Sequence, residues 1–268
     1  GNKAIIKETQ LLRYFENDKN TDVIAFYLEG FDPNDGRKFC EIASNSTKDI
    51  VVFTGGKTES GKAAASSHTA SLGMNHKVMA SAFKQNSVIH PETELELKNY
   101  LKVYSMIANP YRKFSTMSIT GEKIAILSVS GGHGVLCADL IEKYGMKLTH
   151  FTETQVEQMQ LLMNPSAAKI AGFKNPIDVT GAVIEEDIVN ILEYLLTQKN
   201  VGIIIMLLLP YPPQISMHLG RKILRVSDKF QKPLITFVPW TQKYNLLKES
   251  LELNHIPCGH TVEDAVQM

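Results

Sequence analysis

The sequence predicts an α/β fold of two doubly wound domains with parallel sheets. Short apolar runs rich in β-branched residues, such as "DVIAFYL" and "VGIIIMLLLP", alternate with segments of helical periodicity. This alternation is typical of βαβ units, whose crossover helices cover both faces of a parallel sheet. An irregular segment, "PYRKFSTMSITGEK", separates two such series. The chain of 268 residues is also longer than the usual single domain.

The first series fills an expected domain of residues 1–112. Its apolar runs predict strands, and the segments between them have one apolar face at helical spacing. In the last two helices the expected faces are Leu72, Met79, Ala82 and Phe83, then Leu95, Tyr100, Leu101 and Tyr104. The expected strands are 22–28, 49–53 and 87–91, and the expected helices are 36–45, about 72–83 and 92–109.

The second series fills an expected domain of residues 121–268, after a linker at 113–120. The segment "NPIDVTG" is expected to be a loop within it. The expected strands are 123–129, 148–151, 201–210 and 233–238, and the expected helices are 134–144, 153–163, 185–198, 217–230 and 242–254.

Composition excludes several classes of function. Twenty-eight Lys plus Arg balance twenty-eight Asp plus Glu, so there is no surplus charge to attract nucleic acid or an anionic membrane. No apolar run is long enough to cross a bilayer, and the first residues lack the apolar core of a signal peptide, so a cytoplasmic setting is expected. Cys40, Cys137 and Cys258 lack zinc or disulfide spacing, so we expect buried free thiols and no metal site.

Residues that follow strands are the candidates for chemistry, because ligands of open parallel sheets lie beyond the carboxyl ends of the strands. Three positions qualify: Glu29, the loop that leads to His68, and the turn "SGGHG" with Gly131 and Gly132. A glycine turn before a helix can cradle phosphate, although a simple tight turn explains it equally well. A strand-end carboxylate can orient a nearby imidazole, so Glu29 and His68 form a candidate pair.

Five motifs in order, "GNKA", "FYLEG…DGRKFCEIA", "GGKTESGKAAASSHTASL", "SVSGGHGVLCAD" and "NPIDVTG", resemble the NDP-forming (ADP-forming) acyl-CoA synthetases, or acetate:CoA ligases, of the succinyl-CoA synthetase superfamily. The resemblance covers essentially the whole chain. It implies a CoA-ligase domain followed by a flavodoxin-like domain. It also implies a reaction in which acyl-CoA, ADP and phosphate give acid, CoA and ATP through a phosphohistidine.

The resemblance also implies roles for single residues. His68 matches the histidine that carries phosphate, and Glu29 matches the glutamate that supports it. Small residues beside His68 leave room for a phosphoryl group, and a second helix N-terminus faces it. The implied phosphate-binding residues are Ser67, Thr69, Ala70, Gly131 and Gly132, and Asn175, Pro176 and Asp178 are expected to shape a loop near the site.

Some features depart from the family pattern. Ala70 stands where the family commonly has Gly, and His133 stands where it often has Pro, which can tighten the phosphate pocket and change the entry to the second helix. The other histidines, His76, His90, His150, His218, His255 and His260, have no context that singles them out.

The chain has no initiating Met and ends in a helical pattern, so we expect it to be part of a longer protein. The resemblance implies partners, fused or separate: a CoA-binding Rossmann domain and ATP-grasp domains that bind CoA and ATP or ADP with Mg²⁺, in a dimer or heterotetramer. An alternative is a regulatory module without catalysis, as in fusions with protein acetyltransferases. The presence of both His68 and Glu29 favours the enzyme.

Overall fold

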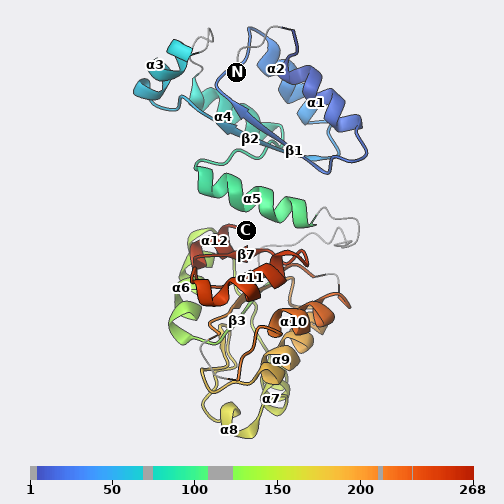
Figure 1. Ribbon diagram of the computed structural model, residues 1–268, viewed down its shortest axis with the longest axis vertical. Coiled ribbons are helices and arrows are strands. Elements are labelled where there is room, and N and C mark those ends of the chain that lie inside the picture. Colours follow the sequence, from blue (N-terminus) through green and yellow to red (C-terminus); the bar gives the residue numbers. More distant parts are fainter. Residues whose placement is uncertain (1–4, 69–74, 108–122, 211–213, 231) are drawn as a thin grey trace. The chain divides into compact units, whose positions relative to one another are not determined.

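The chain forms two compact units, residues 1–108 and 109–268, in a computed structural model. The structure describes residues 5–68, 75–107, 123–210, 214–230 and 232–268, without the side chains of residues 66–68 and 107 (Figure 1). The expected linker at 113–120, together with Thr69 and Ala70, therefore lies outside the described residues.

The sheet of the first unit is parallel, as expected. Strand β1 (Val23–Leu28) pairs with β2 (Asp49–Thr54), with Leu28 opposite Thr54 at the carboxyl ends. The expected strand at 87–91 contributes only a parallel bridge between Ile89 and Val51. Pro91 lacks a backbone N–H and cannot extend that ladder, so the chain leaves the sheet after one bridge.

Within the described residues of the first unit, five helices accompany this sheet. Helices α1 (Glu8–Asn17), α2 (Asp35–Ala43) and α4 (His76–Gln85) share one core cluster with the strands, and α5 (Glu94–Ile107) packs against both strands. Helix α3 (Glu59–His68) follows β2. The core cluster is built on fully buried aromatic and aliphatic side chains, among them Leu12, Phe39, Val52 and Phe83.

Two details of these helices differ from the sequence prediction. Helix α1 was not predicted, because Leu12 is its only buried apolar residue and the apolar stripe is too narrow to be read. In α5, Leu95 is 47% exposed, while Asn99 and Val103 are buried. In α4 the predicted face is confirmed for Met79 and Phe83, which are buried.

The described part of the second unit contains a five-stranded parallel sheet in the order β4-β3-β5-β6-β7. This is the strand order of flavodoxin-like folds. All strands run parallel, but the order in which the chain adds them to the sheet reverses at a switch point, here between β3 and β5. The strands are β3 (Ile124–Ser128), β4 (Ile177–Asp178), β5 (Ile203–Leu207), β6 (Leu234–Phe237) and β7 (Cys258–Gly259).

Two segments of this sheet differ from the prediction. The expected strand at 148–151 makes only a bridge from Leu148 to Ile124, because the side-chain amide of Asn175 takes the next backbone groups, the oxygen of Thr149 and the N–H of Ile126. The segment expected as a loop, 175–181, contains the short strand β4, because Asp178 pairs with Ser128 of β3.

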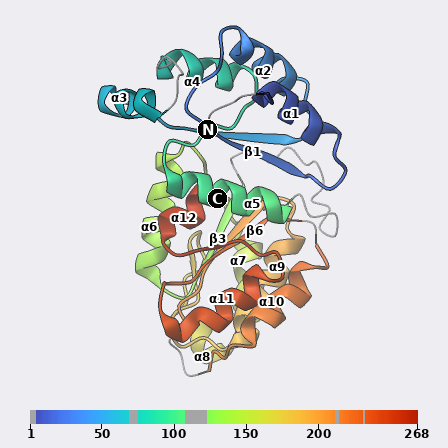
Figure 2. The same cartoon turned by 45° about the horizontal axis from the view of Figure 1, so that its top comes forward.

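Helices cover the strands of the second unit, and the elements can be followed in Figure 2. Helix α6 packs against α12, and α10 packs against both α9 and α11. The helices are α6 (Gly131–Lys143), α7 (Glu153–Leu161), α8 (Pro165–Ala168), α9 (Glu185–Thr197), α10 (Leu219–Ser227), α11 (Asn245–Glu252), α12 (Val262–Gln267) and the 3-10 turn η1 (Gln242–Tyr244).

The three cysteines are buried and free, as expected. Burial raises the pKa of the Cys137 thiol to about 12, which keeps it protonated and unreactive at neutral pH. Among the helices of the described residues, none is both long enough and apolar enough to span a membrane.

Candidate functional site

The carboxyl ends of β1 and β2 bring three residues of the first unit together. Glu29 follows β1, and its Oε1 accepts a hydrogen bond from the hydroxyl of Tyr27 at 3.3 Å. The same hydroxyl lies beside Gly55, which follows β2, so that a Cβ at Gly55 would stand only 2.6 Å from it. Glycine is therefore the residue that lets Tyr27 lie across the two strand ends and reach Glu29.

His68 is the last residue of α3, the helix that follows the loop after β2. The strand that leads to Glu29 and the strand that leads to α3 are neighbours, as the sequence suggested. The side chains of Ser67 and His68 lie outside the described residues, so the pairing of Glu29 with His68 stays a prediction.

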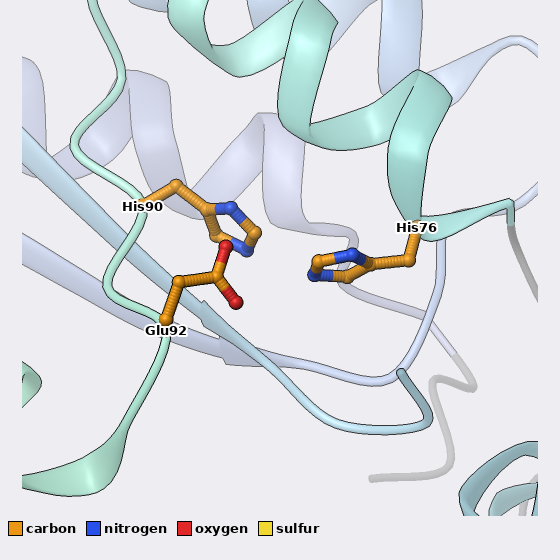
Figure 3. A group of neighbouring side chains, drawn as sticks. All are labelled: His76, His90 and Glu92. Atoms are coloured by element: carbon orange, nitrogen blue, oxygen red, sulfur yellow. The ribbon is translucent and has the colours of Figure 1, made fainter. Parts of the chain in front are cut away.

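A second group of side chains lies at the carboxyl end of β2. The ring of His90, just after the bridge at Ile89, has its Nε2 2.9 Å from Oγ1 of the buried Thr54. His76, the first residue of α4, places its ring 5.3 Å from that of His90, and Figure 3 shows both rings beside the Glu92 carboxylate. Lys57 Nζ lies 3.0 Å from Glu92 Oε2.

The surroundings shift the pKa values of two members of this group. Burial lowers the pKa of the His90 imidazole, with Lys57 and His76 acting in the same direction and Glu92 opposing them. His90 is therefore neutral at neutral pH. The hydrogen bond from Lys57 lowers the pKa of the Glu92 carboxyl, which is therefore ionised.

In the second unit, the glycine turn after β3 forms the first turn of a helix. Helix α6 begins at Gly131, three residues earlier than the sequence predicted, so Gly131 and Gly132 are helical residues and both are exposed. Ser130, the N-cap residue, makes no side-chain capping hydrogen bond, because its hydroxyl lies 3.0 Å from His133 Nδ1. The first-turn N–H groups of α6 are thus left without this usual cap.

His133 connects this turn to the next part of the sheet. Its ring stacks on Phe237, the last residue of β6, with the ring centres 5.4 Å apart. The histidine that departs from the family pattern therefore holds the entry of α6 in two ways, through Ser130 and through Phe237.

Asp178 and Asn175 have different places at this end of the sheet. Asp178 Oδ1 accepts a hydrogen bond from the backbone N–H of Thr180, and its Oδ2 lies beside Gly131. Asn175 lies nearer the start of β3, where its side-chain amide makes hydrogen bonds of 2.7 to 3.0 Å with the backbone of Ile124, Ile126 and Thr149. Asn175 thus fastens its loop to β3, whereas Asp178 places a carboxylate next to the helix N-terminus.

Sequence reasoning missed Tyr27 and the group around His90. Tyr27 lies near the end of the strand predicted at 22–28, and His90 lies within the strand predicted at 87–91. The strand-end rule that selected Glu29 and Gly131 also selects Glu92, the residue directly after that predicted strand, and this was the available signal for the group around His90.

Comparison with known proteins identifies the family. The model of the succinyl-CoA ligase-like flavodoxin domain matches residues 1–104. The chain is 32% identical, over 98% of its length, to "Acetate--CoA ligase [ADP-forming] II subunit alpha" of Pyrococcus furiosus, of which it covers 56%. The chain is homologous to the ADP-forming acyl-CoA synthetases. It spans about half the length of that relative.

A second relative is named for a different carboxylic acid. The chain is 26% identical, over 100% of its length, to "4-hydroxybutyrate--CoA ligase [ADP-forming]" of Nitrosopumilus maritimus and covers 36% of it. The dinucleotide-forming acetyl-coenzyme A synthetase 1 of Ca. Korarchaeum cryptofilum, solved in complex with phosphate and ADP, superposes with a TM-score of 0.85 at 25% identity. That comparison covers 98% of this chain and 55% of the other. The fold predicted from the sequence is thereby confirmed.

Proposed function

We propose that this chain is the phosphohistidine-carrying part of an ADP-forming acid:CoA ligase. The observation that supports this most strongly is the similarity, over 98% of the chain, to a subunit of an ADP-forming acetate:CoA ligase. In the proposed reaction, phosphate displaces CoA from acyl-CoA to give an acyl phosphate. The phosphoryl group then passes to His68 with release of the acid, and from His68 to ADP to give ATP.

A histidine suits this relay because its neutral ring is nucleophilic near neutral pH. Attack by a ring nitrogen on the acyl phosphate forms an N–P bond, breaks the bond between phosphorus and the acyl oxygen, and releases the carboxylate. Attack by an oxygen of ADP then breaks the N–P bond. Residues of small volume on either side of His68, from Ala63 to Ser71, fit the space that such a group needs.

Glu29 is proposed to orient the ring of His68. Its carboxylate is held by Tyr27 at the end of the strand next to the one that leads to α3. A carboxylate that accepts one ring N–H fixes the tautomer and makes the other nitrogen the nucleophile.

The first turn of α6 is proposed to meet the phosphoryl group. Within the described residues nothing lies within 4 Å of a Cβ added at Gly132, so this side of the turn has room for an anion. The N-terminal N–H groups and the helix dipole favour negative charge there. The Asp178 carboxylate limits the room on the Gly131 side, which directs an incoming phosphoryl group toward Gly132.

CoA and the nucleotide with its Mg²⁺ are proposed to bind mainly to CoA-binding and ATP-grasp domains, whether fused to this chain or on a second subunit. The acid is proposed to be a small carboxylic acid, since two relatives are named as ligases of acetate and of 4-hydroxybutyrate.

The experiment that tests the proposal is phosphohistidine formation. The chain in its full-length protein, or with its nucleotide-binding subunit, is incubated with ATP labelled at the γ-phosphate and Mg²⁺. Label that is acid-labile and base-stable is expected on the wild type and absent from His68→Asn. His150→Ala, which changes an exposed histidine of the second unit, serves as the matched control and is expected to keep the label. Equal labelling of His68→Asn would refute the proposal.

A further inference from the structure

The side chains of His76, His90 and Glu92 lie close enough together to bind one metal ion. One ring nitrogen from each histidine and one carboxylate oxygen of Glu92 all lie within 4.8 Å of one another. Figure 3 shows the three side chains converging from the start of α4 and from the segment after the bridge at Ile89. All three residues belong to the first unit and to its described part.

A buried ring nitrogen without a partner makes this more than a chance grouping. Nε2 of His76 is buried, and among the residues that the structure describes it has no hydrogen-bond partner. A buried polar atom left unpaired costs about 1–3 kcal/mol, so native proteins usually satisfy such atoms. A cation that accepts the lone pair of this nitrogen would satisfy it.

The surroundings resemble the supporting contacts of metal ligands. The hydroxyl of Thr54 lies 2.9 Å from His90 Nε2 and fixes the orientation of that ring, which leaves Nδ1 as the ring nitrogen of His90 for a metal. Lys57 Nζ lies 3.0 Å from one carboxylate oxygen of Glu92 and donates to the Glu92 backbone oxygen at 2.6 Å, which fixes the segment that carries the ligand. Hydrogen bonds of this kind orient ligands and tune their basicity.

We propose that His76, His90 and Glu92 bind a divalent transition metal of the zinc type. Two imidazoles and one carboxylate are a ligand set suited to zinc, with bonds of about 2.0–2.2 Å and a fourth position open to water. Calcium and magnesium prefer ligand sets made of oxygen alone.

Binding requires only side-chain movement. Ligand atoms around a tetrahedral zinc ion lie about 3.3 Å apart, given the bond lengths above. The Glu92 side chain is 59% exposed and free to rotate toward the rings while Lys57 keeps its other oxygen. The centres of the His76 and His90 rings already lie 5.3 Å apart, with the ring planes tilted by 43°.

Zinc titration of the metal-free full chain tests the site. Calorimetry with Zn²⁺, and metal analysis after dialysis, are expected to give one zinc per chain and no comparable binding of Mg²⁺ or Ca²⁺. Glu92→Gln keeps the size of an exposed side chain, so it is expected to fold, and it is expected to weaken binding by more than 100-fold, as is His76→Ala. Thr54→Val, which removes only the supporting hydroxyl, is expected to weaken binding by about 10–100-fold.

The control is His150→Ala, whose binding is expected to equal that of the wild type. Unchanged affinity of Glu92→Gln and His76→Ala would overturn the proposal. A cobalt-substituted chain with the intense absorption of thiolate ligands would also overturn it, because the metal would then be held by cysteine. The titration needs no acyl-CoA or nucleotide, so its result does not depend on whether His68 carries phosphate.

Discussion

A carboxylate oxygen of Asp178 lies so close to the backbone of Gly131 that a Cβ added at Gly131 would stand 2.7 Å from it. Gly131 begins α6, and Asp178 ends β4, the strand beside β3. Two motifs far apart in the sequence therefore meet at one point, and only a glycine allows the contact. At the next residue, Gly132, nothing in the described structure outside the adjoining helix backbone lies within 4 Å of the position that a Cβ would take.

Gly131→Ala is expected to destabilise the second unit by about 1–3 kcal/mol, because the new methyl must displace Asp178 from its hydrogen bond to Thr180. Gly132→Ala is the matched control. It is expected to be neutral or to stabilise by up to about 1 kcal/mol, since alanine is the better helix former. Urea unfolding of both variants measures the difference.

A double-mutant cycle tests whether the contact with Asp178 causes the destabilisation expected of Gly131→Ala. Asp178→Ala removes the carboxylate that the methyl meets, so Gly131→Ala should cost much less in that background, with a coupling energy of about 0.5–3 kcal/mol. Additive effects of the two substitutions would show that the contact is not the reason for the loss.

Glu29→Gln is expected to slow labelling of His68 by about 10–100-fold, the usual range for a residue that orients another. Tyr27→Phe leaves the carboxylate in place and removes only a hydrogen bond of 3.3 Å, so its effect should be smaller. The rate of phosphohistidine formation from labelled ATP is the measurement. Glu41→Gln, on the exposed surface of α2, should leave the rate unchanged, and equal rates for Glu29→Gln and the wild type would remove Glu29 from the relay.

Asn175→Ala is expected to destabilise the second unit by about 2–4 kcal/mol. It leaves three backbone groups, on Ile124, Ile126 and Thr149, without their hydrogen bonds. Asn190→Ala removes one hydrogen bond from an exposed side chain and should stay within about 0.5 kcal/mol of the wild type. Thermal unfolding distinguishes the two, and equal melting temperatures for both variants would contradict a loop-fastening role for Asn175.

Much of the fold could be predicted because the sequences of buried parallel strands are unbroken apolar runs. Ile203–Leu207 and Leu234–Phe237 are of this kind, and both are strands. Short pairings that depend on side chains far away in the sequence could not be predicted. Strand β4 has only two residues, and the loop beside it is fastened by Asn175, whose partners are known only once β3 is in place.

For the candidate site, the positions of single residues could be predicted, but the contacts between their side chains could not. The strand-end rule selected Glu29 and Gly131, and the structure places both at carboxyl ends of parallel strands. It does not by itself say which side chains meet, so the contact of Gly131 with Asp178 and the reach of Tyr27 to Glu29 required coordinates. His76 begins a helix, and the sequence gives no sign that its ring turns toward His90.

The last prediction concerns acid stability of the second unit through Glu185, at the start of α9. Burial opposes ionisation of this carboxyl, but hydrogen bonds from Lys222 and Ser216 outweigh burial and lower its pKa below the ordinary 4.5. The folded state therefore binds fewer protons than the unfolded state, so the stabilisation is complete above about pH 4.5 and is lost as the pH falls through the lowered pKa. The difference in unfolding free energy between wild type and Glu185→Gln should be constant near neutrality and shrink below that pH. Glu186→Gln, which alters an exposed partner of Lys222, should show a smaller change, and equal pH profiles for wild type and Glu185→Gln would rule the mechanism out.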